Sequence, residues 1–560
     1  MVDLLTKRVY RKTLTSIVAS IQPQMEYQSL VEMVKYGVTI FRINFSWFKE
    51  ASPQQWVKQL KDIDLIARQQ ELVLGIMLDT RGPEFRVRAR KDDPDGPDKE
   101  KEQPRRIYVY DEGRDVSLTL DPNSETNDEE IAVEAPPMTK FKELGDRVVF
   151  GDGDYEATIR SRSPDGKSMV VSCERPLHVW KRAKVNFPGT SVTADALSDE
   201  DTEIIKFFLN EAQALPGQGL DKRVGFMFAQ SFIKCAEDVD RLIHFLQNGM
   251  DKIKIRKPIV IAKLETVESS RPENLSQIIE RASAVMIARG DLANETSRQE
   301  VPQLQRDIIK VAKRLNKPVL LATQVYASMR DSNRYNCTRP EAEDVRSALE
   351  LGVDGFVLTG ETSSRPKDPE KVIAALASQI CKDEFDLIKE DERDPSEGNH
   401  YERLREVERE TFHRTMKREM RDPNLPIERQ RWLGTTDFAI AAVFRANTYG
   451  AIGLFPFTTG GGTVREMGRF YPETDIYPIT GSAETAQGLL LCRCTHPVLV
   501  ETDFPLEQLY IDRLKDLVRR VVNELALRKR RPDAHYAICT MAHPPLQPGG
   551  ADTLLRIRID

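Results

Sequence analysis

The chain has 560 residues, too many for one ordinary hydrophobic core, so we expect two to four domains. Hydrophobic residues make up 40% and charged residues 30%, as in folded soluble proteins, and the net charge is −6. This mild acidity predicts neither nucleic acid nor a membrane as a partner. The first residues lack the pattern of a secretory signal, no apolar run reaches the roughly 18–20 residues that span a bilayer, and seven scattered cysteines suit reduced thiols in the cytoplasm.

Eight short apolar runs, each ending in polar or charged residues, are typical of strands buried on both faces of a parallel sheet. They cover Leu14–Ser20, Val38–Ser46, Leu72–Thr80, Val224–Ser231, Ile259–Glu265, Ala284–Asp291, Pro318–Gln324 and Gly355–Glu361. Stretches with helical spacing lie between them, at Tyr27–Tyr36, Gln54–Gln70, Glu200–Leu215, Ala236–Gln247 and Glu300–Leu315. Strands and helices that alternate in this way form right-handed βαβ units, and eight of them predict a closed (β/α)8 TIM barrel of the α/β class.

The ends of these predicted strands carry many polar and charged side chains. In (β/α)8 barrels the carboxyl ends of the strands form the face on which catalytic groups sit. A purely structural barrel has no need for so many charged groups at one rim, so we expect an active site there. The residues concerned are Arg42, Asn44, Ser46, Asp79, Thr80, Ser231, Lys263, Glu265, Arg289, Asp291, Thr323 and Glu361.

The barrel pattern is interrupted between residues 87 and 186. A charged segment rich in Pro and Gly (90–106) predicts an exposed loop, and the short alternating runs after it predict a small all-β domain. These runs are Ile107–Tyr110, Val116–Leu120, Arg147–Phe150, Tyr155–Ile159 and Met169–Cys173. Because this insert follows the third strand, at the catalytic rim, we expect a lid over the site.

The remaining boundaries follow from composition. Residues 1–86 and 187–380 form the barrel, and residues 381–434 read as a charged helical insertion or linker with a solvated surface. Residues 435–560 predict a separate open α/β domain. It has a helix at Asp437–Ala446, strands at Ala451–Phe457, Ile476–Thr480, Pro497–Val500 and His535–Thr540, and a final hairpin at Thr553–Ile559.

Three charged residues predict phosphoryl chemistry. Lys263 and Glu265 lie two apart on one strand, so their side chains face the same way, and Asp291 ends the next strand. Two carboxylates with open positions suit Mg²⁺, which takes its remaining ligands from water and substrate oxygens. A lysine beside that metal can neutralise charge on a phosphoryl group in transfer.

The ordered set of motifs FRINFS, LDTRGPEFR, VNFPG, SFI, AKLE, MIARGDL, ATQ and LTGET resembles the barrel motifs of the pyruvate kinase family. The resemblance is strong over about residues 11–380 and weaker over 435–560. It implies transfer of the phosphoryl group of phosphoenolpyruvate to ADP, which gives pyruvate and ATP in the last step of glycolysis. It also implies the cofactors Mg²⁺ (or Mn²⁺) and K⁺, and a homotetramer in the cytoplasm.

The resemblance implies a role for each matching residue. Lys263 matches the lysine that stabilises the phosphoryl group, and Glu265 and Asp291 match the Mg²⁺ ligands. Thr323 matches the threonine implicated in protonation of the enolate, and Arg42 the arginine that reaches the phosphates of both substrates. The other implied contacts to phosphoenolpyruvate are Ser231 and the backbone of Gly290 and Asp291.

A potassium site is implied by the same resemblance. Its ligands would be Asn44, Ser46, Asp79 and the carbonyl of Thr80, an all-oxygen set with one carboxylate. Glu84 is the residue found in K⁺-requiring members of the family. The alternative for Glu84 is an ordinary ion pair with Arg86.

The nucleotide side departs from the family pattern. The implied contacts to ADP are Arg42, Asn44, Arg86, Asp152 and Lys184. However, Trp47 replaces a histidine near the nucleotide, and the pair Ala183–Lys184 replaces a lysine–glycine pair. A catalytically impaired relative that binds phosphoenolpyruvate or a sugar phosphate in a regulatory role is therefore the alternative hypothesis. Another barrel enzyme that handles phosphoenolpyruvate or oxaloacetate is disfavoured by the lid and the C-terminal domain.

A glycine-rich loop in the C-terminal domain matches the place where many members bind a sugar bisphosphate. Exposed backbone amides and hydroxyls can bind an anion there, and a tight turn is the equal alternative. The second element of such a site, around 543–551, lacks the expected tryptophan and arginine. The residues of the candidate anion loop are Thr458, Thr459, Gly460, Gly461, Gly462 and Thr463.

Overall fold

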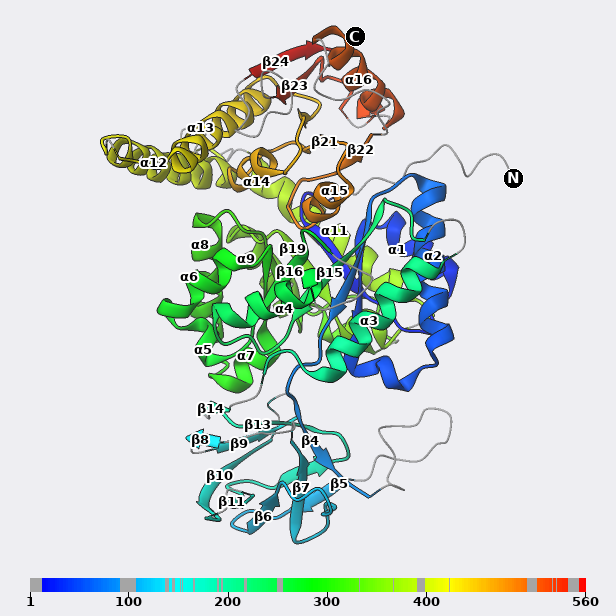
Figure 1. Cartoon of the computed structure of the whole chain (residues 1–560), viewed down its shortest axis with the longest axis vertical. Coiled ribbons are helices and arrows are strands. Elements are labelled where there is room, and N and C mark those ends of the chain that lie inside the picture. Colours follow the sequence, from blue (N-terminus) through cyan, green and yellow to red (C-terminus); the bar gives the residue numbers. More distant parts are fainter. Residues whose placement is uncertain are drawn as a thin grey trace.

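The computed structural model shows an eight-stranded parallel barrel at the centre of the chain (Figure 1). It describes residues 13–559 except 91–106, 136–140, 144–146, 152, 154, 165–166, 189–190, 193–194, 216–218, 249–254, 332, 366, 390–397, 423, 501–510, 526, 530 and 542–552. The strands are β1 (Ser16–Ser20), β2 (Val38–Asn44), β3 (Leu74–Asp79), β15 (Val224–Gln230), β16 (Ile259–Leu264), β17 (Ala284–Ala288), β18 (Val319–Ala322) and β19 (Gly355–Leu358). The barrel closes where β1 pairs in parallel with both β2 and β19, so the predicted fold class is confirmed.

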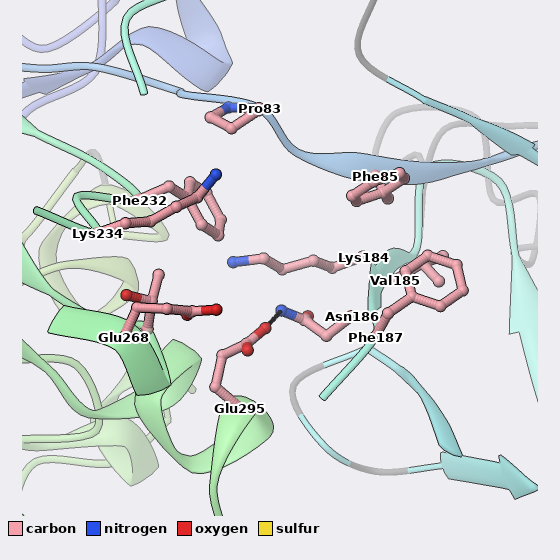
Figure 2. A pocket seen from close by; sticks show the side chains of 11 residues that line it. Pro83, Phe85, Lys184, Val185, Asn186, Phe187, Phe232, Lys234, Glu268 and Glu295 are labelled. Atoms are coloured by element: carbon pink, nitrogen blue, oxygen red, sulfur yellow. Dashed lines mark hydrogen bonds between the residues drawn. The ribbon is translucent and has the colours of Figure 1, made fainter. Parts of the chain in front are cut away.

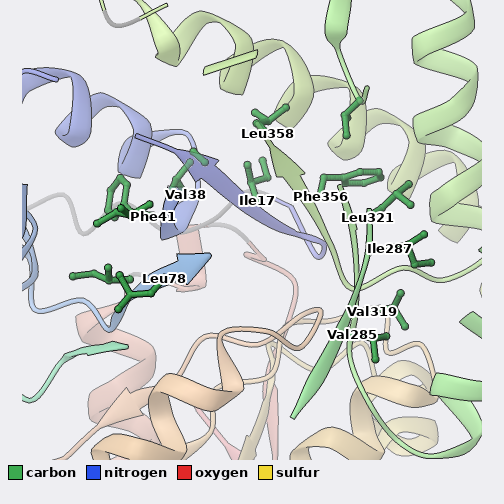
Figure 3. Packing of buried hydrophobic residues seen from close by; sticks show 14 of the residues in the cluster. Ile17, Val38, Phe41, Leu78, Val285, Ile287, Val319, Leu321, Phe356 and Leu358 are labelled. Atoms are coloured by element: carbon green, nitrogen blue, oxygen red, sulfur yellow. The ribbon is translucent and has the colours of Figure 1, made fainter. Parts of the chain in front are cut away.

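Each barrel strand contributes to two hydrophobic cores. Ile17 of β1 packs in the cluster between the strands and their helices, whereas its neighbour Val18 packs in a second cluster. Phe356 and Val357 of β19 divide in the same way, and Figure 3 shows Phe356 among the side chains of the first cluster. Successive side chains of a strand point to opposite faces, so a strand buried on both faces must be apolar at every position. This explains the continuous apolar runs of the sequence.

Helices cover the outside of the barrel. The predicted helices are confirmed with shifts of one residue at most, as α1 (Tyr27–Lys35), α2 (Pro53–Gln70), α3 (Asp199–Ala214), α4 (Ala236–Asn248) and α8 (Val301–Arg314). Further helices are α6 (Pro272–Arg281), α9 (Arg339–Glu350) and α11 (Pro369–Ile388). Short helices follow the strand ends: η1 (Phe45–Glu50), α5 (Val267–Ser270), α7 (Arg289–Glu295), η2 (Ala327–Arg330) and α10 (Gly360–Ser363).

The insert after β3 forms a second closed barrel of seven strands at one end of the molecule (Figure 1). Its strands are β4 (Phe85–Arg88), β6 (Asp115–Thr119), β7 (Glu130–Glu134), β9 (Arg147–Phe150), β10 (Tyr155–Arg162), β11 (Ser168–Ser172) and β13 (Lys184–Asn186). Two pairs lie outside this barrel, β5 (Ile107–Tyr110) with β12 (Leu177–Trp180), and β8 (Phe141–Glu143) with β14 (Ser191–Val192). Most of the charged loop predicted at 90–106 lies outside the described residues.

The C-terminal α/β domain lies at the opposite end of the large barrel from the insert (Figure 1). Its strands are β20 (Leu454–Pro456), β21 (Ile479–Thr480), β22 (Val498–Leu499), β23 (Tyr536–Met541) and β24 (Thr553–Arg558), and β23 pairs with β24 in antiparallel fashion. Its helices are α14 (Gly462–Arg469), α15 (Ala483–Leu489), α16 (Ile511–Glu524) and the turn η5 (Leu527–Lys529).

Two long helices carry the charged segment that precedes this domain, α12 (His400–Glu419) and α13 (Ile427–Thr448). α13 starts ten residues before the predicted helix at Asp437 and crosses the expected boundary at 434. It continues because Leu433 and Thr436 are fully buried against the C-terminal domain, so the charged composition hid an apolar stripe. Similarly, β14 extends the insert beyond residue 186.

A cluster of basic groups lies where the barrel meets the C-terminal domain. Lys313 on α8 pairs with Asp354 at 2.7 Å, and both side chains are buried. Lys317 donates to the carbonyls of Glu280 and Ala282 at 3.0 and 2.5 Å. Burial lowers the pKa of Lys317 to about 8, and the nearby charge of Arg465 adds to this effect.

Replacing Phe356 by alanine tests the outer core. Phe356 is fully buried, and deletion of a buried aromatic ring costs about 3–5 kcal/mol of the free energy of unfolding. Phe385→Ala is the matched control because Phe385 is 66% exposed, and we expect it to cost below about 0.5 kcal/mol. Denaturant titrations followed by circular dichroism measure both variants, and equal midpoints would contradict the packing described.

Lys317 predicts a pH dependence of stability. Its pKa is about 8 in the fold and 10.5 as the ordinary value, so between these pH values the unfolded chain binds more protons. The free energy of unfolding therefore rises with pH across this window, and the rise is absent below it. We expect Lys317→Met to show a smaller rise from pH 8 to 10.5 than the wild type in denaturant titrations. Lys310→Met, which alters an exposed lysine on α8, should keep the wild-type slope.

Candidate active site

Four charged side chains form one buried network at the carboxyl ends of the strands. Arg42 on β2 donates from Nε to Asp79 Oδ2 of β3 at 2.5 Å. Lys263 on β16 lies with its Nζ 3.1 Å from Asp79 Oδ1 and 3.3 Å from Oε2 of Glu265. None of the four is more than 9% exposed, so the strands hold two basic and two acidic side chains away from water.

These charges set one another's protonation. Burial alone would raise the pKa of Asp79, but the charges of Arg42 and Lys263 outweigh it and lower the pKa. Burial would likewise lower the pKa of Lys263, but Asp79 and Glu265 raise it. Burial raises the pKa of Glu265 to about 7, with Lys263 opposing and Asp291 adding to the shift. Lys263 therefore stays a cation at neutral pH.

Ser231, directly after β15, links this network to the neighbouring strand end. Its hydroxyl accepts from Lys263 Nζ at 2.6 Å and donates to the carbonyl of Thr80 at 2.5 Å. The next amide, of Phe232, donates to Glu265 Oε1 at 2.7 Å. Phe232 has a φ of 54°, in the left-handed region that non-glycine residues seldom adopt.

Thr323 is held on the opposite side of the same rim. Its φ is 68°, and that of Gln324 is 53°, so two successive residues lie in the left-handed region. Thr323 Oγ1 accepts from the amide of Gly290 at 2.8 Å, and its carbonyl accepts from Arg289 Nη2 at 2.9 Å. Arg289 in turn pairs with Asp344 at 2.5 Å. Strained backbone that the surroundings fix in this way is typical of functional sites.

The candidate Mg²⁺ ligands, Glu265 and Asp291, fit a divalent metal by their donor chemistry. Oε2 of Glu265 is buried and accepts no hydrogen bond, although Lys263 Nζ lies 3.3 Å away. Asp291 lies on α7 and contacts the ammonium of Lys184. Two carboxylates and open positions are what Mg²⁺ uses beside substrate oxygens. The part of the chain that the structure describes holds no cluster of three or more His, Cys, Asp or Glu side chains that could bind a metal alone.

The candidate K⁺ ligands come from the adjacent ends of β2 and β3. Asn44 is paired with Asp79 in register, and Asn44 Oδ1 accepts from the amide of Ser46 at 3.0 Å. The carbonyl of Thr80 accepts from Ser231. Carboxamide, carboxylate, hydroxyl and carbonyl oxygens are suitable donors for a monovalent cation, and K⁺ binding there stays a prediction.

Glu84 forms the ion pair that the sequence offered as the alternative. Its Oε2 lies 2.7 Å from Arg86 and 3.3 Å from Arg81. The pKa of Glu84 is lowered to about 2, because the charges of Arg86 and Lys184 outweigh burial.

The predicted nucleotide contacts divide between the barrel and the insert. Arg42 and Asn44 lie on β2, Arg86 and Lys184 lie on the paired lid strands β4 and β13, and Asp152 lies outside the described residues. A cavity of about 60 Å³ separates β13 from the barrel rim (Figure 2). Aromatic rings line its lid side and charged residues line much of its barrel side: Phe85 and Phe187, and Lys234, Glu268 and Glu295.

Some contacts at this cavity were not predicted. Asn186 of the lid donates to Glu295 of α7 at 3.4 Å, and burial raises the pKa of Glu295 to about 7 despite this bond. Asn186 lies in the VNFPG motif, and that motif was the sequence feature from which a contact of this residue at the site could have been predicted.

By contrast, Glu361, which the sequence placed at the rim, is fully buried and accepts hydrogen bonds from the amides of Val325 and Thr359 at 3.1 and 2.7 Å. Its role is therefore to hold loop backbone.

The candidate anion loop lies between β20 and α14, in the C-terminal domain. The amide of Gly461, which has a φ of 76°, donates to Thr458 Oγ1 at 2.8 Å, and Arg465 Nη2 donates to the carbonyl of Gly460 at 2.8 Å. Thr459 accepts from Thr485, and Gly462 and Thr463 begin α14. These bonds form the tight turn, and anion binding stays a prediction. The second element around 543–551 lies outside the described residues.

Asp79→Asn tests the buried network. Removing one partner leaves Arg42 and Lys263 buried without their shared counter-charge, which costs about 3–5 kcal/mol of the free energy of unfolding. Asp62→Asn is the control, because its partner Lys58 is half exposed and such surface pairs contribute below about 1 kcal/mol. Denaturant titrations measure both, and an Asp79→Asn midpoint equal to that of the control would contradict the network.

No helix among the described residues is long and apolar enough to cross a membrane.

The family model for the pyruvate kinase barrel domain matches residues 11–371, and that for the pyruvate kinase alpha/beta domain matches 437–557. Pyruvate kinases of Staphylococcus epidermidis and Staphylococcus aureus are each 24% identical to the chain, over 87% of it and 72% and 71% of their own lengths. A crystal structure of a pyruvate kinase from Cryptosporidium parvum has a TM-score of 0.76 at 22% identity, covering 98% of this chain and 97% of that one. With two family models matching in order over most of its length, the chain belongs to the pyruvate kinase family.

Proposed function

We propose that the protein transfers the phosphoryl group of phosphoenolpyruvate to ADP, giving pyruvate and ATP. The observation that carries this proposal is the convergence of Arg42, Asp79, Lys263 and Glu265 in one buried network. Phosphoryl transfer needs cations held in place around oxygens more than it needs covalent chemistry. Arg42 and Lys263 supply two such cations, and their buried carboxylate partners fix their positions before substrate arrives.

The substrate is bound by groups on both sides of the network. Arg42 and Lys263 face the phosphate oxygens, while Ser231 and the backbone of Gly290 and Asp291 receive the carboxylate. Glu265 and Asp291 would hold Mg²⁺ (or Mn²⁺), which when bound neutralises charge on the phosphoryl oxygens. The ammonium of Lys263 offsets the negative charge of the phosphoryl group as it moves in line to ADP.

Thr323 takes part in the last step, the protonation of the enolate on carbon. After transfer, the enolate of pyruvate needs a proton on its methylene carbon. Thr323 Oγ1 is fixed by the Gly290 amide at 2.8 Å, so its hydroxyl is oriented at the rim rather than free to rotate. We assign the side of protonation to Thr323, with a water as the proton carrier.

The remaining ligands follow from the same site. K⁺ would bind Asn44, Ser46, Asp79 and Thr80 beside Arg42. ADP would lie toward the lid, against Arg42, Asn44, Arg86, Asp152 and Lys184. We further propose a cytoplasmic homotetramer with neither nucleic acid nor membrane as a partner.

A regulatory protein without turnover is the second candidate. The contact of Lys184 with Asp291 favours it, because this contact places a lid cation on a carboxylate that the reaction needs for metal. Such a protein would bind phosphoenolpyruvate through the retained barrel residues and release no pyruvate.

Pyruvate formation measured with a lactate dehydrogenase-coupled assay distinguishes the two candidates. With phosphoenolpyruvate, ADP and Mg²⁺ we expect turnover that K⁺ stimulates. Lys263→Met should lower kcat by at least about a hundredfold, because a fixed charge at the transition state is lost. Lys257→Met is the matched control, since Lys257 is exposed and precedes the opposite end of β16. No turnover with ADP, GDP or UDP, from folded protein that binds phosphoenolpyruvate, would favour the regulatory candidate.

A further inference from the structure

The lid is docked on the short helix α7 and the loop after it. Arg147 Nη2 of β9 donates to the carbonyl of Thr296 at 2.5 Å, and Arg298 Nη2 donates to the carbonyl of Gly153 at 3.1 Å. These contacts bring the lid strand β13 against the candidate metal ligand Asp291. The position of the lid and the charge at Asp291 are therefore linked.

Lys184 of β13 makes the ionic contact of this docked lid. Its side chain extends from β13 toward the barrel across the cavity (Figure 2). The ammonium contacts Asp291 Oδ1, lies 4.0 Å from Glu84 Oε1, and lies 5.5 Å from the centre of the Phe232 ring. Lys184 is 14% exposed, Asp291 19% and Glu84 9%, so water screens these charges only weakly.

The ammonium of Lys184 lies between two carboxylates. One of them, Asp291, is a candidate metal ligand, and the other, Glu84, lies beside the strand that leads into the insert. The cationic end of Lys184 thus contacts a carboxylate oxygen that a divalent metal needs.

We propose that Lys184 is a built-in counter-cation of Asp291, which a divalent metal must displace in order to bind. Two cations cannot share one carboxylate oxygen at close range without strong repulsion. Metal binding therefore breaks the ionic contact between the lid and α7. The released ammonium remains on the lid, within reach of the phosphate oxygens of a nucleotide. This inference rests on the metal site of the proposed function, and it adds that the lid itself competes for that site.

Metal binding to the full chain without substrates tests the competition directly. Mn²⁺ is titrated and the free ion is followed by electron paramagnetic resonance. We expect Lys184→Met to bind Mn²⁺ about tenfold or more tightly than the wild type, because a charge-assisted contact no longer has to be broken. Lys184→Arg keeps the cation and should bind Mn²⁺ as the wild type does. Lys167→Met, which removes an exposed lysine from a lid turn, should also leave the affinity unchanged.

A second measurement follows the lid. Without metal, hydrogen–deuterium exchange over β13 (184–186) should be faster in Lys184→Met than in the wild type, and Mn²⁺ should speed exchange of this strand in the wild type only. Glu265→Gln should abolish tight Mn²⁺ binding and so identify the site.

The outcomes separate this proposal from the proposed function. Equal or weaker Mn²⁺ affinity in Lys184→Met overturns the counter-cation role, whereas turnover in the coupled assay would stand. If the wild type binds no Mn²⁺ and Lys184→Met does, the proposal is supported in its strongest form. If neither the wild type nor Lys184→Met binds Mn²⁺, the counter-cation role of Lys184 is overturned. The metal site proposed at Glu265 and Asp291 is then overturned as well.

Discussion

Buried charge must be paired, and this constraint organises the site of this protein. Arg42 pairs with Asp79 on the adjacent strand, and Lys263 of a third strand lies between Asp79 and Glu265, so that two basic side chains face two acidic ones. Because each of the two cations has a carboxylate partner, neither cation is buried unpaired. A phosphate that enters the site adds negative charge that the network cannot neutralise alone. We propose that Glu265 and Asp291 supply the missing positive charge, because their carboxylates can bind a divalent cation together with the substrate.

The architecture of the two barrels makes this pairing possible. Parallel strands buried on both faces place their carboxyl ends at one rim, where polar groups are surrounded by rigid apolar packing. Neighbouring residues of β1 show this packing: Ile17 packs in the core between the strands and their helices, and Val18 packs in the second core. The same rigidity holds Phe232, Thr323 and Gln324 in left-handed conformations that an isolated peptide would leave.

The two strands that connect the insert to the barrel, β4 and β13, add charged side chains to the site. β4 carries Arg86 and β13 carries Lys184, and the strands are paired with each other. Their charges meet at Glu84, next to the strand β4 that leads into the lid. A movement of the lid must therefore change the charge around Glu84 and Asp291. The insert is therefore an electrostatic part of the site.

The fold and most of the candidate site could be predicted from the sequence. Continuous apolar runs indicated the eight strands, since a strand buried on both faces leaves no other pattern. The spacing of Lys263 and Glu265 placed both on one face, because side chains two apart on a strand point the same way. Local patterns of this kind depend only on neighbouring residues, and they also predicted five barrel helices within one residue at each end. The roles of individual residues came from the resemblance of motifs, which the two family models support at the level of the family.

Contacts between segments far apart in the chain were decided only by the tertiary structure. Glu361 carried the same charge as the rim carboxylates Glu265 and Asp291 in the sequence, yet it turns inward and accepts hydrogen bonds from two loop amides. The start of α13 at Ile427 depended on burial against a domain that follows it in sequence. Lys184 and Asp291 are separated by 107 positions, and no local pattern relates them. The sequence alone determined which charges exist and which strand ends present them. Which charges meet was decided by how the lid packs on α7, because an ion pair depends on distance in space and not on distance along the chain.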